Sequence, residues 1–266
     1  MKNGNRRSIQ AGLFILAAVV LSSCSRNAES TPIPETTMPA STPAAPGSIS
    51  PASATLSASE SVAQRYGFPA EPDPGRRYIF YLHGRIIEEQ GLPAVSPEYG
   101  EYRYEEILQD LQNAGFVVIS EVRDPGPGSQ FYIDRTKTQI QLLLDTGVPP
   151  GSITIIGASM GGAMAVSISN QLGKADLNYV IMGTCASDQI GEWIQQGLTV
   201  SGNILSIYEA SDTEYSGSCG ELFTHSEGKG LSRFTEITLH LGSGHGYLYQ
   251  PLDEWLLPAE DWANQE

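Results

Sequence analysis

Apolar residues gather in six short runs between residues 78 and 241. Most of these runs contain no charged residue, and β-branched or aromatic side chains dominate them, which is typical of strands buried on both faces of a sheet. The runs predict strands over 78–82, 116–119, 153–156, 179–182, 204–208 and 234–241.

Between these runs, apolar residues recur every three or four positions, which is the spacing of one face of a helix. This spacing predicts helices over 104–114 and 130–146, from Gly157 to Leu172, and over 252–264. Strands that alternate with helices indicate an α/β fold whose mostly parallel sheet is covered by helices on both faces. Ligands of such sheets bind at the carboxyl ends of the strands.

The first 24 residues follow a different pattern. Three basic residues precede an apolar run from Ala11 to Leu21. As a helix this run would rise about 16 Å, too little for a hydrocarbon core of about 30 Å, and its layout is that of a secretory signal. The run ends in Leu-Ser-Ser-Cys24, which resembles the lipobox of bacterial lipoproteins. The alternative is an ordinary signal peptide followed by an incidental cysteine.

The lipobox resemblance implies that residues 1–23 are a signal peptide and that Cys24 carries the lipid. It also implies a location in the bacterial cell envelope, on the periplasmic side or the outer surface. Residues 24–70 are dominated by Ser, Thr, Pro and Ala, which cannot bury enough apolar surface to fold, so we expect a disordered tether. Residues 71–266 then suit one domain.

The charge balance restricts the possible partners. The 266 residues contain 15 Lys and Arg against 30 Asp and Glu, a formal net charge of −15. A nucleic-acid partner is therefore not expected, and any membrane contact would depend on the lipid rather than on charge. The chain contains no Cys-x-x-Cys, His-Glu-x-x-His or Gly-x-Gly-x-x-Gly pattern. We therefore expect no metal and no organic cofactor. We also expect a monomer.

The clearest chemical motif is Gly157-Ala-Ser159-Met-Gly161, between a predicted strand and a predicted helix. Glycines at the ends of Gly-x-Ser-x-Gly allow a sharp turn that exposes the serine hydroxyl, and the following helix N-terminus favours developing negative charge. Ser159 is therefore the candidate nucleophile. The alternative is a glycine-rich turn in which Ser159 only caps the helix.

A serine nucleophile needs a base and an acid that orients it. His245, in the loop after the sixth strand, is the candidate base, with His225 as the second choice and His240 as a structural residue. Asp212, in the loop after the fifth strand, is the candidate acid. The other acids are weaker candidates, with Asp188 first among them, followed by Glu209 and Asp253.

The nucleophile turn and the order Ser159, Asp212, His245 resemble the α/β-hydrolase superfamily over residues 77–263. The resemblance implies an oxyanion hole formed by the backbone N–H groups of Met160 and Arg85, with His83 bracing the loop. Because only about twenty residues separate the fourth and fifth strands, it also implies that no large lid domain is present.

The resemblance further places the fourth and fifth strands side by side, and Cys185 and Cys219 follow these two strands. An exported protein meets an oxidising environment, so we predict a Cys185–Cys219 disulfide.

Together these features predict a serine hydrolase that cleaves small carboxylic esters or thioesters through an acyl-enzyme. Two alternatives remain open at this point. One is a binding lipoprotein that has this fold but no activity, and the other is a peptidase or acyltransferase that uses the same three residues.

Overall fold

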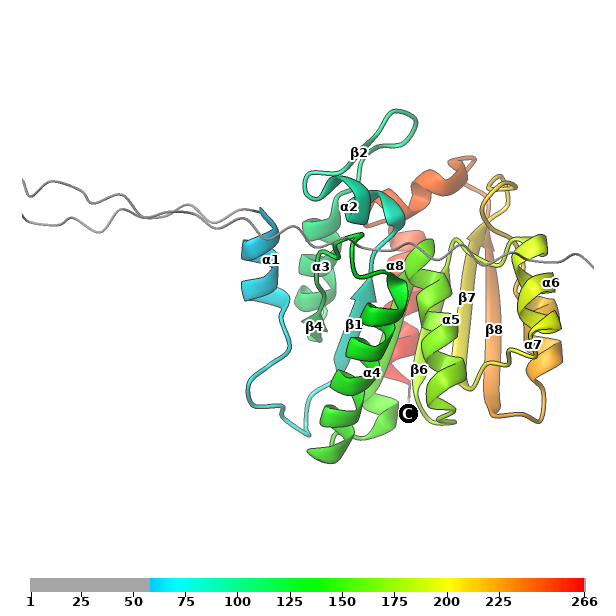
Figure 1. The fold of residues 1–266 in the computed structure, drawn as a ribbon. Helices are drawn as coiled ribbons and strands as arrows, with labels where there is room; N and C mark the ends of the chain where they lie inside the picture. Colours follow the sequence, from blue (N-terminus) through cyan, green and yellow to red (C-terminus); the bar gives the residue numbers. More distant parts are fainter. Residues whose placement is uncertain (1–57, 266) are drawn as a thin grey trace, which may run out of the picture. The chain divides into compact units, whose positions relative to one another are not determined.

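Six parallel strands form the central sheet of the computed structural model, which describes residues 58–265 (Figure 1). Their order in the sheet is β4-β1-β5-β6-β7-β8, and every neighbouring pair is parallel. The strands are β1 (Tyr78–Leu82), β4 (Val117–Ile119), β5 (Ile153–Ala158), β6 (Asn178–Met182), β7 (Gly202–Glu209) and β8 (Leu231–Leu239). A separate antiparallel hairpin pairs β2 (Val95–Ser96) with β3 (Gly100–Glu101).

Alternate residues of the strands point into two hydrophobic clusters, one on each face of the sheet. In β1, Ile79 and Tyr81 belong to one cluster, whereas Tyr78, Phe80 and Leu82 belong to the other. Because both faces are buried, the strand needs apolar side chains at every position. The predicted sheet with helices on both faces is confirmed.

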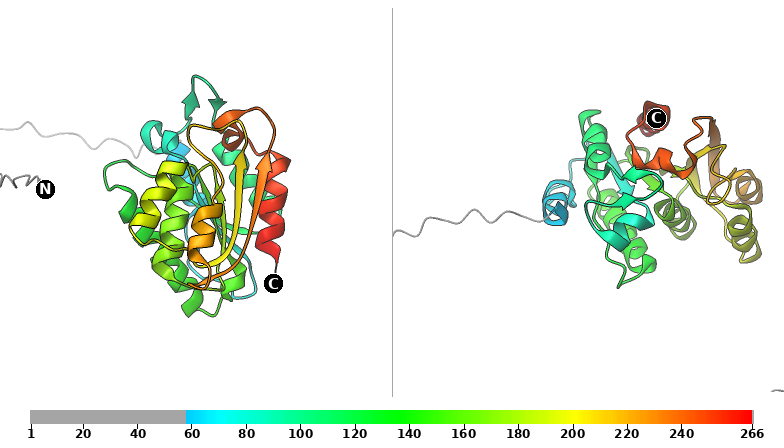
Figure 2. Two further views of the ribbon diagram at one scale, coloured as in Figure 1. Left: turned by 90° about the vertical axis from the view of Figure 1, so that its right-hand side faces the viewer. Right: turned by 90° about the horizontal axis from the view of Figure 1, so that it is seen from above.

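The helices divide between the two faces (Figure 2). Buried residues of one cluster come from α1 (Ala58–Tyr66), α2 (Arg85–Gln90), α3 (Tyr104–Asn113) and α8 (Asp253–Asn264). Those of the other come from α4 (Ser129–Asp145), α5 (Met160–Leu172), α6 (Ser187–Gln195) and α7 (Gly220–Ser226). Two short 3-10 helices complete the fold, η1 (Pro150–Ser152) and η2 (Gly244–Tyr249).

Helix α1 lies within the segment that we expected to be a tether. Val62 and Tyr66, one helical turn apart, are each only 1% exposed, and the Tyr66 carbonyl accepts a hydrogen bond from the amide of Ser120. This one buried face orders residues 58–66, so the tether does not extend over them. The rest of the predicted tether before residue 58, the signal peptide and Cys24 lie outside the described residues.

Residues 183–201, between β6 and β7, contain only α6 and its connecting loops, so no large lid domain is inserted there. Within residues 58–265, none of the helices is both long and apolar enough to cross a membrane.

Candidate active site

Ser159 is the single residue between β5 and α5, and its backbone conformation is one that few residues other than glycine adopt. Its φ and ψ are 54° and −117°, and its amide donates a 2.8 Å hydrogen bond to the carbonyl of Met182 on the neighbouring strand β6. A strained conformation of this kind persists only where the surrounding structure holds it in place. The turn therefore fixes the serine at the carboxyl end of the sheet.

Two glycines make this turn possible. A Cβ atom on Gly157 would overlap the carbonyl of Gly161 and lie 2.8 Å from Cα of Gly162. A Cβ atom on Gly161 would overlap the Leu82 carbonyl and lie 2.9 Å from the carbonyl oxygen of His83. The start of α5 is thus pressed against the end of β1, at a separation that only glycine allows.

The same contact brings the start of α2 next to the serine. A Cβ atom on Gly84 would lie 3.5 Å from Cβ of Ser159. Arg85 and Met160 are the first residues of α2 and α5, and an N–H group at that position has no acceptor within its own helix. Across the described part of the chain, no hydrogen bond uses either N–H group. Both remain free to bind a developing oxyanion.

His83 holds this loop from inside the protein. Its Nδ1–H donates to the Gly84 carbonyl at 2.8 Å, and its Nε2 accepts from the amide of Arg123 at 3.0 Å. Burial and the nearby Arg123 cation lower the pKa of His83 to about 3, so the ring is neutral. The Arg123 guanidinium is buried as well and pairs with Glu88 at 3.2 Å. Both ring nitrogens of His83 are therefore occupied, one by the loop after β1 and the other by the loop after β4.

His245 and Asp212 come from the loops after β8 and β7, and their side chains contact each other. Nδ1 of His245 lies 2.5 Å from Oδ2 of Asp212, and both side chains are buried. Burial alone would raise the pKa of Asp212, but hydrogen bonds from His245, Ser216 and the amide of Tyr215 outweigh it and lower that pKa. Asp212 is therefore ionised near neutral pH and fixes the orientation of the imidazole.

Ser159 and His245 line one pocket of about 380 Å³. Because Nδ1 of His245 faces Asp212, its Nε2 is the nitrogen left for a proton from the pocket. The structure thus places Ser159, His245 and Asp212 at one end of the sheet, together with the N–H groups of Met160 and Arg85.

The other sequence candidates lie elsewhere or act differently. His225 is part of α7, and Asp188 accepts a hydrogen bond from the amide of Gln189 in α6. Glu209, a weaker candidate for the acid, accepts hydrogen bonds from the amides of Leu241 and Gly242 at 2.8 and 3.1 Å. It therefore ties the end of β7 to the loop that carries His245.

Ser216 is a second residue that holds the loops of this site in place, and no sequence pattern predicts this role. Its hydroxyl donates a 2.8 Å hydrogen bond to Oδ2 of Asp212, the same oxygen that faces His245. The amide of Gly217, the next residue, donates to the Thr184 carbonyl at 3.1 Å. The segment that holds Asp212 is thereby joined to the loop after β6.

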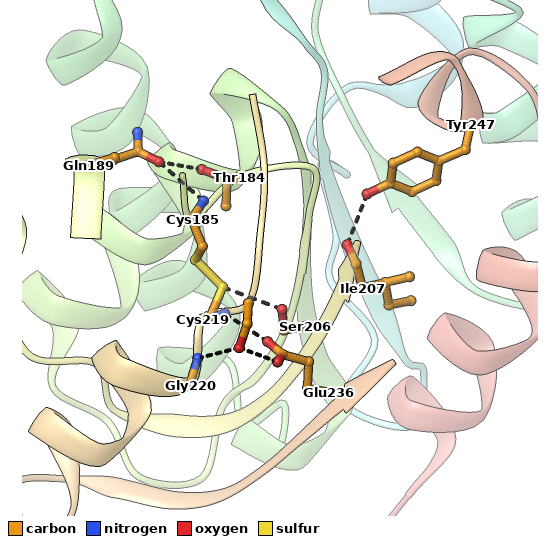
Figure 3. The surroundings of a disulfide bond; sticks show 10 residues. Thr184, Cys185, Gln189, Ser206, Ile207, Cys219, Gly220, Glu236 and Tyr247 are labelled. Carbon is orange, nitrogen blue, oxygen red and sulfur yellow. Dashed lines mark hydrogen bonds between the residues drawn. A yellow bond between two sulfur atoms is a disulfide. The ribbon is translucent and has the colours of Figure 1, made fainter. Parts of the chain in front are cut away.

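A disulfide between Cys185 and Cys219 reinforces this junction (Figure 3). On one side of the bond, the side-chain oxygen of Gln189 accepts hydrogen bonds from Thr184 and from the amide of Cys185. On the other side, Glu236 of β8 accepts from the amide of Cys219 at 2.7 Å. The bond links the loops after β6 and β7, which is the pairing that the sequence predicts.

Four tyrosines line the pocket, and no sequence motif marks them as a group. The rings of Tyr99 and Tyr102 each pack on Tyr249, with centroids 5.4 and 4.8 Å apart, and the ring of Tyr215 lies 5.1 Å from that of His245. They come from the β2–β3 hairpin and the residue after it, from the loop after β7 and from η2. Three separate loops must meet before these rings become neighbours.

Comparisons with known proteins add structural likenesses only. No protein-family model and no curated protein matches the sequence. Among solved structures, a phospholipase/carboxylesterase from Dyadobacter fermentans is 8% identical with a TM-score of 0.47, and the match covers 74% of this chain and 94% of that one. A hyperthermophilic esterase from the archaeon Pyrobaculum calidifontis is 18% identical with a TM-score of 0.46, covering 74% and 77%. A dienelactone hydrolase from Anabaena variabilis is 16% identical with a TM-score of 0.44, covering 72% and 87%.

The architecture itself identifies the fold. The parallel sheet, the strained serine between β5 and α5, and the loops after β7 and β8 that carry Asp212 and His245 have the arrangement expected from the sequence resemblance. Residues 58–265 have the α/β-hydrolase fold, and no large lid domain is inserted within them.

Proposed function

We propose that this protein is a serine hydrolase that cleaves small carboxylic esters or thioesters. The observation that carries the proposal is the shared pocket of Ser159 and His245, together with the 2.5 Å contact of His245 with Asp212. The nucleophile Ser159 and the base His245 thus share one pocket, and the acid Asp212 orients the base, which is the arrangement that acyl transfer requires.

In the proposed reaction, Oγ of Ser159 attacks the carbonyl carbon while Nε2 of His245 takes the hydroxyl proton. The carbonyl oxygen becomes an oxyanion, which the N–H groups of Met160 and Arg85 stabilise. As the tetrahedral intermediate collapses, His245 returns the proton to the leaving alcohol or thiol, and an acyl-enzyme remains. Water, activated by His245, then attacks the acyl group and releases the acid and free Ser159.

A substrate panel tests this proposal. Purified protein would be assayed with short-chain esters, thioesters and peptides, beside the variants Ser159→Ala and Asp212→Asn. We expect ester or thioester hydrolysis that falls by about 10⁴-fold or more in Ser159→Ala. Cleavage of peptides alone would instead favour a peptidase. Transfer of the acyl group to an added alcohol in preference to water would favour an acyltransferase, and no turnover of any substrate would favour a binding protein.

We also propose that a lipid on Cys24 anchors the protein in the bacterial cell envelope. The support is the order of basic residues, apolar run and Cys24 in the sequence. Cells that express the full chain, labelled with a radioactive fatty acid, should incorporate it into the protein and lose it in Cys24→Ser. A Cys24→Ser protein that stays labelled and membrane-bound would contradict the anchor.

A further inference from the structure

Positive and negative charges are not balanced at the end of the pocket that is lined by Tyr99, Tyr102, Tyr215 and Tyr249, here called the tyrosine end. Arg85 and Glu89 are four residues apart on α2, so these opposite charges are neighbours on one helix face. Glu98, at the turn of the β2–β3 hairpin, has no such counterpart among the residues that line the pocket. Glu214 precedes Tyr215 in the loop after β7, although it does not itself line this pocket. This end of the pocket therefore carries net negative charge.

The phenol groups respond to this charge. Burial and then the Glu98 carboxylate raise the pKa of Tyr99, and Asp212 and Tyr215 act in the same direction. The pKa of Tyr215 is raised as well, chiefly by Glu214, with smaller contributions from burial and from Glu98. Part of each pKa increase comes from the Glu98 carboxylate, whose negative charge at this pocket attracts cations.

Arg103, two residues after Glu101 of the hairpin, does not cancel this negative charge. The amide of Arg103 donates to the Tyr249 carbonyl at 2.8 Å, but its guanidinium pairs with Glu106 and hydrogen-bonds to Gln250. Tyr215 is 51% exposed, so a ligand can reach it from solvent. Aromatic rings bind ammonium groups through their electron-rich faces, and a nearby carboxylate strengthens that attraction.

We propose that this end of the pocket binds the cationic group of the substrate, so that the preferred esters carry a quaternary ammonium or protonated amine. Tyr99, Tyr215 and Glu98 would hold that group, while the ester carbonyl lies at Ser159. The inference rests on the proposed hydrolase function, and it names the substrate class of the same site.

Two acetate esters of equal shape test the inference. One has a trimethylammonium group on its alcohol, and the other has an uncharged tert-butyl group in the same place. At low ionic strength we expect kcat/KM to be about tenfold higher for the ammonium ester, mainly through KM, with the preference shrinking as salt is added. Glu98→Gln should bring the two esters close to equality, and Tyr215→Leu should weaken the preference in the same direction.

Glu101→Gln is the matched control, because Glu101 lies on the same hairpin but does not line this pocket. It removes the same charge and should leave the preference unchanged. Equal kcat/KM values for the two esters in the wild-type protein would overturn the inference. So would an equal loss of preference in Glu98→Gln and Glu101→Gln, which would mean that only net charge matters.

Hydrolysis and cation binding can also be separated. If neither ester is hydrolysed, the proposed function fails, and ligand-observed NMR with the trimethylammonium ester decides the inference alone. Binding to Ser159→Ala that is weakened in Ser159→Ala/Glu98→Gln would uphold it, and equal binding to both proteins would overturn it.

Discussion

The two sides of the pocket are built by different means. On the nucleophile side, the end of β1 and the start of α5 touch through backbone atoms, and this contact has room only for glycine at position 161. The turn itself has room only for glycine at position 157. On the acid–base side, the loops after β7 and β8 are held by side chains, namely Glu209, Ser216 and the Cys185–Cys219 disulfide. The nucleophile side thus requires residues without a side chain, whereas the acid–base side is held together by contacts between side chains.

This difference predicts different responses to substitution. An added methyl group on the nucleophile side has no space and must move the backbone, so the whole fold is affected. On the acid–base side, each brace can be removed separately, because the others still hold Asp212 and His245. The effects there should be partial.

Gly161→Ala should have the largest effect. The new Cβ would overlap the Leu82 carbonyl, and we expect a loss of about 3 kcal/mol or more in the free energy of unfolding, or no folded protein at all. Chemical denaturation followed by circular dichroism measures this loss. Gly191→Ala in α6 is the control, since a Cβ there meets nothing within 4 Å and should stabilise the helix by about 0.5–1 kcal/mol. Equal stability of the two variants would contradict the comparison.

Removal of the disulfide should come next. The bond spans a sequence separation of 34, and closing a loop of this size contributes about 3–4 kcal/mol in the chain-entropy model. Cys185→Ala/Cys219→Ala should therefore unfold at lower denaturant concentration than the oxidised protein, yet remain folded and keep part of its activity. Treating the wild-type protein with a reductant should lower its unfolding midpoint in the same way. An unfolding midpoint that does not respond to reductant would refute the role of this bond.

Glu209→Gln should cost about 1–3 kcal/mol, because the amide group of Gln cannot accept all the hydrogen bonds that the carboxylate accepts. Burial opposes ionisation of Glu209, but the amides of Leu241 and Gly242 outweigh it and lower its pKa in the folded protein. The contribution of this carboxylate is therefore complete above its ordinary pKa and is lost as the pH falls through the lowered one.

Denaturation over a pH series measures this dependence. Glu209→Gln should lose less stability than the wild-type protein as the pH falls below about 4.5. The exposed Glu227→Gln is the control and should follow the wild-type curve. Parallel curves for the wild-type protein and Glu209→Gln would contradict the assigned role.

Ser216→Ala should have the smallest effect on stability, about 1 kcal/mol or less. Asp212 keeps its contact with His245 but loses one of its donors, so we expect kcat for ester hydrolysis to fall by about tenfold and the acidic limb of the pH–rate profile to shift. Ser216→Thr retains the hydroxyl and should recover most of the rate. A Thr variant no better than the Ala variant would argue that the hydrogen bond plays no part.

Much of the fold could be predicted because most of the strands are largely apolar. The bounds of β1 agree with the prediction, whereas β8 begins three residues earlier than predicted, in a stretch where apolar and polar residues mix. Helices α2 and α6 were not predicted, since each has only one buried residue, Ile87 and Ile190, and so shows little periodicity. The two-residue strands of the hairpin are too short for any pattern.

Within the site, the residues next to motifs and strand ends could be proposed from the sequence, because parallel strands deliver their carboxyl ends to one edge. Ser216 and the four tyrosines could not. Ser216 acts through a contact within its own loop, and Tyr99, Tyr215 and Tyr249 become neighbours only through loop packing. Glu209 was considered as an acid on its position alone, and its hydrogen bonds to the loop after β8 became visible only in the fold.

The most direct test of the account is covalent labelling of Ser159. The purified protein would be treated with a fluorophosphonate, which reacts with a serine only where a base and an oxyanion hole activate it, and its peptides analysed by mass spectrometry. We expect one phosphonylated residue, Ser159, with no label in Ser159→Ala and slow labelling in His245→Ala. An unlabelled wild-type protein, or label that persists in Ser159→Ala, would contradict it.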